Sequence, residues 1–270
     1  MSTFLFASPV FGPVHSRRLG LSLGVNLLPA DGKLCTFDCL YCECGFNIDN
    51  RPKTPMPSRA LVAERLEERI RALEAEGRPI DAITFAGNGE PTMHPEFPAI
   101  AADTEAIRDR LAPNAKLCVL TNATNLLKPE VAAALERFDL PMLKLDAMDP
   151  GWVKRVNRPQ RPHDPTAVAA AMKRFGAKCV VQTMFLAGTA DGVSVDNTTD
   201  DFVKPWLEAV KAIRPKLVSI YSLDRDAPCS TLRKADQARL AEVGRLVEAA
   251  GIPVQVSISA SAVRREKERN

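Results

Sequence analysis

Short apolar, β-branched runs alternate with amphipathic helical segments along almost the whole chain, and this alternation constrains the fold most strongly. Parallel strands joined by right-handed crossover helices give such a pattern, in an open doubly wound sheet or in a full or partial barrel. We expect a partial (β/α)6 TIM-type barrel with an extra C-terminal strand and helix. The expected strands are Ser22–Leu28, Asp81–Ala86, Lys116–Thr121, Met142–Asp146, Lys178–Leu186, Leu217–Leu223 and Val254–Ile258.

The best marked helix is expected over Ser58–Glu76. An N-cap serine follows Pro57, apolar residues recur at three- and four-residue spacing, and Gly77 suits the end. The other expected helices are Glu96–Leu111, Pro129–Arg137, Pro165–Phe175, Asp201–Ile213 and Lys234–Ala250. Asp201 and Pro205 suit the start of the helix over Asp201–Ile213.

Two segments, Leu28–Pro57 and Gly188–Thr199, show neither pattern and are expected to be loops. Both follow strands, which places them at the carboxyl edge of a parallel sheet, where ligands bind. Connections of this length inside a compact domain usually carry function or move.

Length and composition set the class of protein. The 270 residues are expected to form a single domain, with residues 1–20 as an N-terminal extension and 29–57 as the cysteine-bearing loop. No run of 18 apolar residues occurs, which argues against a membrane protein. Positive charge follows the apolar stretch of Met1–Arg18, the wrong order for a secretion signal, so a cytoplasmic location is expected. The net charge of +3 does not point to nucleic acid.

The strongest chemical signal is the cluster of Cys35, Cys39 and Cys42, with Cys44 close behind. Three thiolates within eight residues can converge on one metal centre, and soft sulfur ligands select zinc, copper(I) or iron–sulfur clusters. Cys44 as a fourth ligand would close the site. Three thiolates on a cubane cluster would instead leave one iron open to a substrate or cofactor.

The spacing of these three cysteines, with Tyr41 before the last, resembles the signature of the radical S-adenosylmethionine superfamily. The resemblance implies a four-iron four-sulfur cluster on Cys35, Cys39 and Cys42. It also implies that the open iron chelates S-adenosylmethionine, and that one electron cleaves the sulfonium to a 5′-deoxyadenosyl radical. The enzyme would then need an external one-electron donor of the flavodoxin or ferredoxin type.

Further residues are similar to cofactor-binding positions of that superfamily. Ala86-Gly87-Asn88-Gly89-Glu90-Pro91 resembles its glycine-glycine-glutamate-proline motif, with Asn88 as a departure. Lys144 and Asp146 are expected on one face of their strand, and they can neutralise each other if that face is the barrel interior. The resemblance then implies that they bind the carboxylate or ribose hydroxyls of the cofactor, as corresponding positions do in the superfamily. The residues assigned to the cofactor by resemblance are Tyr41, Gly87, Asn88, Gly89, Glu90, Asn122, Lys144, Asp146 and Gln182.

Four segments are most similar to the wyosine-synthase-like branch, whose best understood members remodel a modified guanosine of tRNA: Phe11–Gly20, Ser22–Leu28, Gln182–Leu186 and Ile220–Arg225. That resemblance makes a tRNA base one candidate substrate, and a peptide or a small metabolite stays open beside it. The chain lacks a second cysteine triad and a strongly basic extension. The residues expected to contact substrate are Arg17, Arg18, Tyr221, Asp224 and Arg225.

Two other classes stay open on the residues alone. A zinc-stabilised nucleic-acid-binding module would be colourless and hold one zinc per chain. A simple electron carrier would bind its cluster through four protein ligands, Cys44 included. Loss of Cys44 should therefore remove the cluster from a carrier but not from a radical enzyme.

Overall fold

The computed structural model describes residues 4–16, 19–224 and 227–257, and contacts divide these into two compact units. The N-terminal unit holds the chain up to Asp38 and Cys44–Leu143, and the C-terminal unit holds Cys39–Glu43 and the chain from Lys144 onward. The cysteine loop therefore supplies residues to both. No helix in the described ranges has the length and apolar character needed to cross a bilayer.

The sheet of the N-terminal unit is mainly parallel. Strands β2 (Gly20–Val25), β3 (Ala82–Phe85), β4 (Lys116–Thr121) and β5 (Leu140–Lys144) follow one another in parallel register. Strand β1 (Val10–Ser16) pairs antiparallel with β2 across a β-bulge. β1 lies in the expected N-terminal extension and was not anticipated from the sequence.

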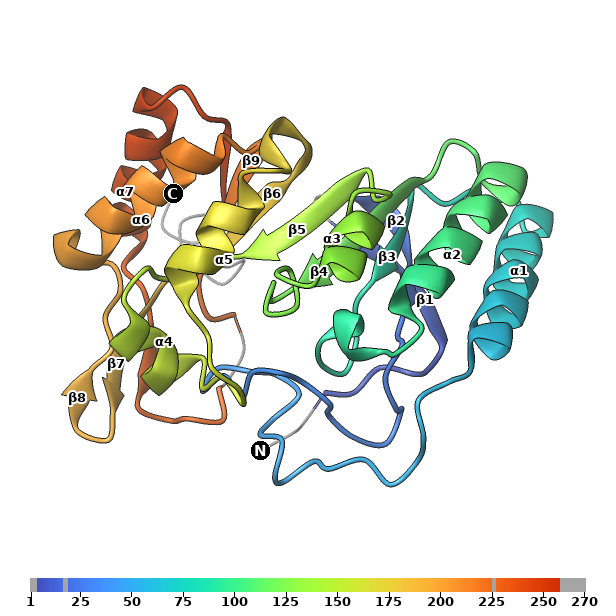
Figure 1. The fold of residues 1–270 in the computed structure, drawn as a ribbon, viewed down its shortest axis with the longest axis horizontal. Helices are drawn as coiled ribbons and strands as arrows, with labels where there is room; N and C mark the ends of the chain where they lie inside the picture. Colours follow the sequence, from blue (N-terminus) through green and yellow to red (C-terminus); the bar gives the residue numbers. More distant parts are fainter. Residues whose placement is uncertain (1–3, 17–18, 225–226, 258–270) are drawn as a thin grey trace, which may run out of the picture. The chain divides into compact units, whose positions relative to one another are not determined.

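Helices α1 (Arg59–Ala75), α2 (Phe97–Leu111) and α3 (Pro129–Leu135) lie side by side along this sheet (Figure 1). The Ser58 side chain accepts a hydrogen bond from the Leu61 backbone and caps α1, as the sequence predicts. The rings of Phe85, Phe97 and Phe138 meet at centroid distances of 5.2 to 6.1 Å and fill the space between sheet and helices.

The C-terminal unit repeats this strand and helix alternation. Strands β6 (Val180–Met184), β9 (Leu217–Tyr221) and β11 (Val254–Ser257) are parallel. Two short helices, α4 (Pro150–Val156) and α5 (Pro165–Met172), precede β6. Helices α6 (Asp200–Ile213) and α7 (Gln237–Ala249) complete the unit, and α7 packs against β9 and β11. β11 and α7 correspond to the expected extra strand and helix.

The expected loop over Gly188–Thr199 is a partial error. Strand β7 (Leu186–Ala190) forms a hairpin with β8 (Val193–Ser194) and also pairs with β10 (Leu232–Lys234). This pairing depends on residues some forty positions apart, which no local pattern reveals. Pro205 does not start α6, since the helix begins at Asp200 and Pro205 lies inside it. The loop expected over Leu28–Pro57 contains no helix or extended strand.

Trp206 anchors the core of the C-terminal unit. Its indole is 1% exposed, packs edge-on against Phe185 at 5.2 Å, and donates to the backbone oxygen of Leu145 at 3.1 Å. The same oxygen accepts from the Thr183 hydroxyl at 2.8 Å. These bonds fix the segment that follows β5, which carries Asp146.

Two buried cysteines, one in each unit, give a test of the packing. Cys118 lies in β4, and Cys179 lies directly before β6. Burial, with a smaller contribution from Asp139, raises the pKa of the Cys118 thiol to about 12, and burial raises the pKa of the Cys179 thiol to about 12. Both residues are 0% exposed. We expect neither to react with iodoacetamide in the native protein at pH 8, because both access and thiolate are lacking.

Site-resolved mass spectrometry of the alkylated protein measures this, with the half-buried Cys229 as internal reference. Alkylation of Cys118 or Cys179 in native protein as fast as Cys229 would contradict the packing described.

Candidate active site

The loop that carries the cysteines is held by polar side chains instead of regular secondary structure. The ammonium of Lys33, 2% exposed, donates to Asp38 at 3.1 Å and to the backbone oxygen of Gly45 at 2.7 Å. Asp38 also accepts from the Asn47 backbone at 2.8 Å, and the Asn47 amide donates to the backbone oxygens of Cys35 and Phe37. Buried groups of this kind persist only when they are partnered.

This loop runs beside the glycine-rich segment after β3. Leu34 donates to the backbone oxygen of Asn88 at 2.9 Å and accepts from the Glu90 backbone at 3.1 Å. Gly89 has φ +140°, and a Cβ there would overlap the backbone oxygen of Leu34. Gly87 has φ +146°, and a Cβ there would overlap the side chain of Asn26. Two glycines are thus required by the close approach of the chain to itself.

Asn88, the departure from the superfamily motif, supports the loop from inside. Its fully buried side chain accepts from the Phe6 backbone at 2.7 Å and donates to the backbone oxygens of Phe6 and Pro29. The Asn88 amide therefore ties an N-terminal segment and the start of the cysteine loop to this turn. No described contact directs that amide toward a ligand.

Glu90 is a buried carboxylate at the end of this motif, 1% exposed. One of its oxygens accepts from the hydroxyls of Thr92 and Thr121, at 2.5 and 2.6 Å, and the other accepts from the Asn122 backbone at 2.7 Å. Burial raises the pKa of Glu90 above its ordinary value, although these hydrogen bonds oppose the shift. The carboxylate joins the loop after β3 to the loop after β4.

Asn122 links Glu90 to the first cysteine. Its side-chain amide lies 3.6 Å from the sulfur of Cys35 and 2.8 Å from the hydroxyl of Thr36. The N-terminal unit therefore brings together the predicted residues Cys35, Gly87, Asn88, Gly89, Glu90 and Asn122.

In the C-terminal unit the predicted residues gather around Asp146. Lys144 lies 2.8 Å from its Oδ2 atom, which also accepts from the Tyr41 hydroxyl and from the Asn157 amide at 3.0 Å. The other oxygen, Oδ1, accepts from the Met184 backbone at 3.0 Å. The ammonium of Lys144 lies 4.9 Å from the centroid of the Tyr41 ring. The expected pairing of Lys144 with Asp146 is present.

The charges in this cluster compensate one another. Burial alone would lower the pKa of Lys144, but the charge of Asp146 raises it above its ordinary value, so the lysine stays protonated. Burial, reinforced by Asp146, also raises the pKa of the Tyr41 phenol well above its usual range, so the hydroxyl keeps its proton. Tyr221 lies close enough to contribute to both shifts.

Asn157 is a site residue that sequence reasoning missed. Its amide lies 3.6 Å from the sulfur of Cys39 and 3.0 Å from the Tyr41 hydroxyl, as well as contacting Asp146. It occupies the C-terminal cap of α4, a helix that the sequence did not predict, so no spacing rule pointed to it. Each unit thus has one asparagine amide beside a cysteine sulfur: Asn122 beside Cys35 in the N-terminal unit, and Asn157 beside Cys39 in the C-terminal unit.

The remaining predicted residues stand further from these contacts. The backbone oxygen of Gln182 in β6 accepts from Leu145 at 2.9 Å, and its side chain is half-buried. Asp224 is exposed, and Arg17, Arg18 and Arg225 lie outside the described residues. Cys44 is buried, with its sulfur 3.9 Å from the backbone oxygen of Gly87. Within either unit, the described residues contain no preformed group of three metal-binding side chains, and the described cysteines form no disulfide.

Comparisons with known proteins define the class. The Radical SAM superfamily matches residues 31–192, and this chain belongs to that superfamily. Its enzymes use a four-iron four-sulfur cluster and S-adenosylmethionine and generally need an external electron donor. A UPF0026 protein of Helicobacter pylori strain J99 is 32% identical over 209 residues, covering 72% of this chain and 62% of that protein. The chain spans about 60% of the length of the curated relatives it matches first.

Solved structures show the same fold at low identity. A radical SAM methyltransferase from Sphaerobacter thermophilus superposes with a TM-score of 0.64 at 17% identity, covering 87% of this chain and 65% of that one. TYW1 with a lysine-pyruvate adduct bound gives a TM-score of 0.55 at 12% identity, covering 84% and 73%. The α/β fold of the partial-barrel type expected from the sequence is therefore confirmed.

The buried ion pair of Lys33 with Asp38, within the cysteine loop, gives a stability test. Replacing Lys33 by Met leaves the Asp38 carboxylate buried without its cation, which should lower the free energy of unfolding by about 3–5 kcal/mol. The double variant Lys33→Met with Asp38→Asn removes both charges yet keeps an acceptor for Asn47, so it should recover much of that loss. Urea unfolding measures both, and an unchanged midpoint for Lys33→Met would refute the role assigned to the pair.

Glu90 gives a pH test on the protein without cofactors. Its folded-state pKa lies above the ordinary value of 4.5, so the folded state binds the proton more tightly than the unfolded state. The resulting stability is full below pH 4.5 and is lost as pH rises through the folded-state pKa. The unfolding free energy of wild type minus that of Glu90→Gln should therefore fall with rising pH, whereas a difference that rises would overturn the assignment. The exposed Glu96→Gln is the matched control.

Proposed function

We propose that this chain cleaves S-adenosylmethionine reductively at a four-iron four-sulfur cluster held by Cys35, Cys39 and Cys42, and abstracts hydrogen from an organic substrate. The observation that carries the proposal is the paired amide contact to sulfur, from Asn122 to Cys35 and from Asn157 to Cys39, both at 3.6 Å. Amide donors to cysteine sulfur stabilise the thiolate form and tune an iron–sulfur cluster. The residues present fit the group.

When bound, the cluster and S-adenosylmethionine supply a 5′-deoxyadenosyl radical after transfer of one electron. The protein contributes binding, orientation and exclusion of water. Glu90 and the two glycines fix the turn of Gly87–Glu90, and we propose that this turn receives the methionine amino group, as the resemblance to the superfamily motif implies. Asn122 couples that turn to Cys35, so one hydrogen-bonded network joins the proposed cofactor turn to the first proposed cluster ligand.

The C-terminal unit supplies the second group of cofactor contacts in this proposal. Lys144 keeps its charge and offers ammonium hydrogens to the cofactor carboxylate. Asp146 positions Lys144 and the Tyr41 hydroxyl, which stays protonated and donates, while Gln182 faces the cofactor. Tyr221 and Asp224, with Arg17, Arg18 and Arg225 beyond the described residues, are proposed to contact substrate.

The remaining proposals follow from the superfamily and from the wyosine-like segments. We propose a flavodoxin- or ferredoxin-like donor, a cytoplasmic location, and one functional domain made of both units. A tRNA base is the substrate that the wyosine-like segments favour. Binding of tRNA would show as an affinity that falls steeply with salt concentration.

Anaerobic reconstitution with iron and sulfide, followed by dithionite and S-adenosylmethionine, tests the reaction. Mass spectrometry should detect 5′-deoxyadenosine from wild type. Cys39→Ser should lose the cluster and reduce the product to background, because one of three ligands is gone.

Cys44→Ser is the matched control, since Cys44 lies in the same loop but is not a ligand in this proposal. It should keep the cluster and the product. Loss of the cluster in Cys44→Ser would favour a four-thiolate electron carrier. A colourless wild type with one zinc per chain would favour the nucleic-acid-binding module.

A further inference from the structure

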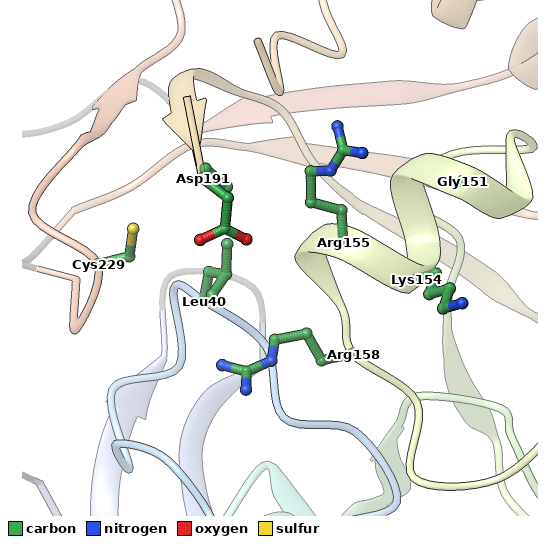
Figure 2. A pocket seen from close by; sticks show the side chains of 8 residues that line it. Leu40, Gly151, Lys154, Arg155, Arg158, Asp191 and Cys229 are labelled. Atoms are coloured by element: carbon green, nitrogen blue, oxygen red, sulfur yellow. The ribbon is translucent and has the colours of Figure 1, made fainter. Parts of the chain in front are cut away.

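A cavity of about 510 Å³ opens in the C-terminal unit, outside the residues given roles above (Figure 2). It lies between α4 with the turn that follows it, the β7–β8 turn, and the segment that leads to β10. A volume of this size suits a small molecule the size of a nucleotide. The residues that line it are Leu40, Gly151, Lys154, Arg155, Arg158, Ala190, Asp191 and Cys229.

The lining is strongly positive. Three cations, Lys154, Arg155 and Arg158, and one carboxylate, Asp191, line the cavity, and their formal charges sum to +2. The whole chain has a net charge of only +3. The C-terminal end of α4 adds at most half a negative charge, so the cations prevail. Among the described residues, Lys154 and Arg155 form no side-chain hydrogen bond or ion pair that would consume their charge.

The backbone holds two lining residues in a conformation that disfavours them. Arg158 has φ +50° at the end of α4, where its N–H donates to the backbone oxygen of Val153 at 3.1 Å. Asp191 has φ +50° in the β7–β8 turn. Glycine is the usual residue at such a helix end. Strained residues of this kind gather at binding sites, where a side chain is needed despite the strain.

The cavity adjoins the cysteine loop within this unit. Leu40, which follows Cys39, donates its N–H to the backbone oxygen of Val156 at 2.9 Å. Its own backbone oxygen accepts from the Cys229 N–H at 3.2 Å. Figure 2 shows Asp191 and Leu40 between Cys229 on one side and Arg155 on the other, with Arg158 below them. A ligand seated here would therefore contact the residue next to a proposed cluster ligand.

We propose that this cavity binds a phosphate group of the substrate. Guanidinium groups grip phosphate with paired hydrogen bonds, and two exposed arginines on one cavity can turn toward the same anion. The inference rests on the proposed function only in naming the ligand as substrate. The phosphate belongs either to a free nucleotide-sized molecule or to RNA, and the two sources are separated below.

Arg158→Gly is the central variant, because it removes the cation while placing the favoured residue at φ +50°. The variant should be at least as stable as wild type to heat, yet bind inorganic pyrophosphate at least tenfold more weakly in calorimetry. Arg214→Gly is the matched control: it makes the same change at φ +54° at the end of α6, outside the cavity lining. It should leave pyrophosphate binding unchanged.

Alkylation of Cys229 locates the binding. Pyrophosphate at saturating concentration should slow its modification by iodoacetamide in reconstituted wild type, and not in Arg158→Gly. A short RNA that protects Cys229 and is displaced by pyrophosphate identifies RNA as the source. Protection by pyrophosphate and nucleotides but not by RNA identifies a free phosphorylated molecule.

Two outcomes would overturn the proposal: pyrophosphate and RNA both fail to bind wild type, or Arg158→Gly and Arg214→Gly weaken binding equally. Calorimetry and alkylation need no turnover. Absence of 5′-deoxyadenosine with intact pyrophosphate binding would therefore count against the proposed function and leave the phosphate site standing.

Discussion

The candidate site residues of the C-terminal unit depend on the buried carboxylate of Asp146. Its side chain has no exposed surface, and its two oxygens accept from a lysine, a phenol, an amide and a backbone N–H. Its backbone oxygen accepts from the buried Asn197 amide at 3.1 Å, and that amide also reaches Met184. A single charge therefore fixes the cysteine loop, the end of β5, the end of β6 and the cap of α4.

Glu90 has the same architectural role in the N-terminal unit but a different electrostatic balance. Asp146 is compensated by the ammonium of Lys144, whereas Glu90 is held by hydroxyls and backbone N–H groups without a described cation. Without a described cation beside it, Glu90 has a pKa that burial raises. Lys144 is buried as well, but the charge of Asp146 keeps it protonated. The C-terminal unit thus offers a fixed positive group, and the N-terminal unit offers a turn held by a carboxylate without a described cation.

The sequence predicts well those features that local chemistry decides. β4 matches its expected bounds, Lys116–Thr121, and α1 begins after its serine cap, because apolar period and capping are properties of neighbouring residues. The pairing of Lys144 with Asp146 is present, although the expected strand over Met142–Asp146 ends at Lys144 and Asp146 lies in the segment that follows β5. Asn157 was missed because its partner Cys39 is distant in sequence, and the β7–β8 hairpin was missed because β10 completes it.

The glycines after β3 have a structural role apart from the cofactor role that the resemblance implies. The atoms that exclude a Cβ at Gly87 and Gly89 belong to Asn26 and Leu34 of the chain itself. Glycine is therefore required at these positions whether or not a cofactor binds. The same contacts fix the backbone of Leu34, which directly precedes Cys35. Lys33 and Asn47 hold that loop through buried hydrogen bonds. Polar side chains therefore fix the shape of the loop, which has no helix or extended strand to do so. An irregular loop built in this way can be held in place by its polar side chains while it carries four buried or half-buried cysteines within ten residues.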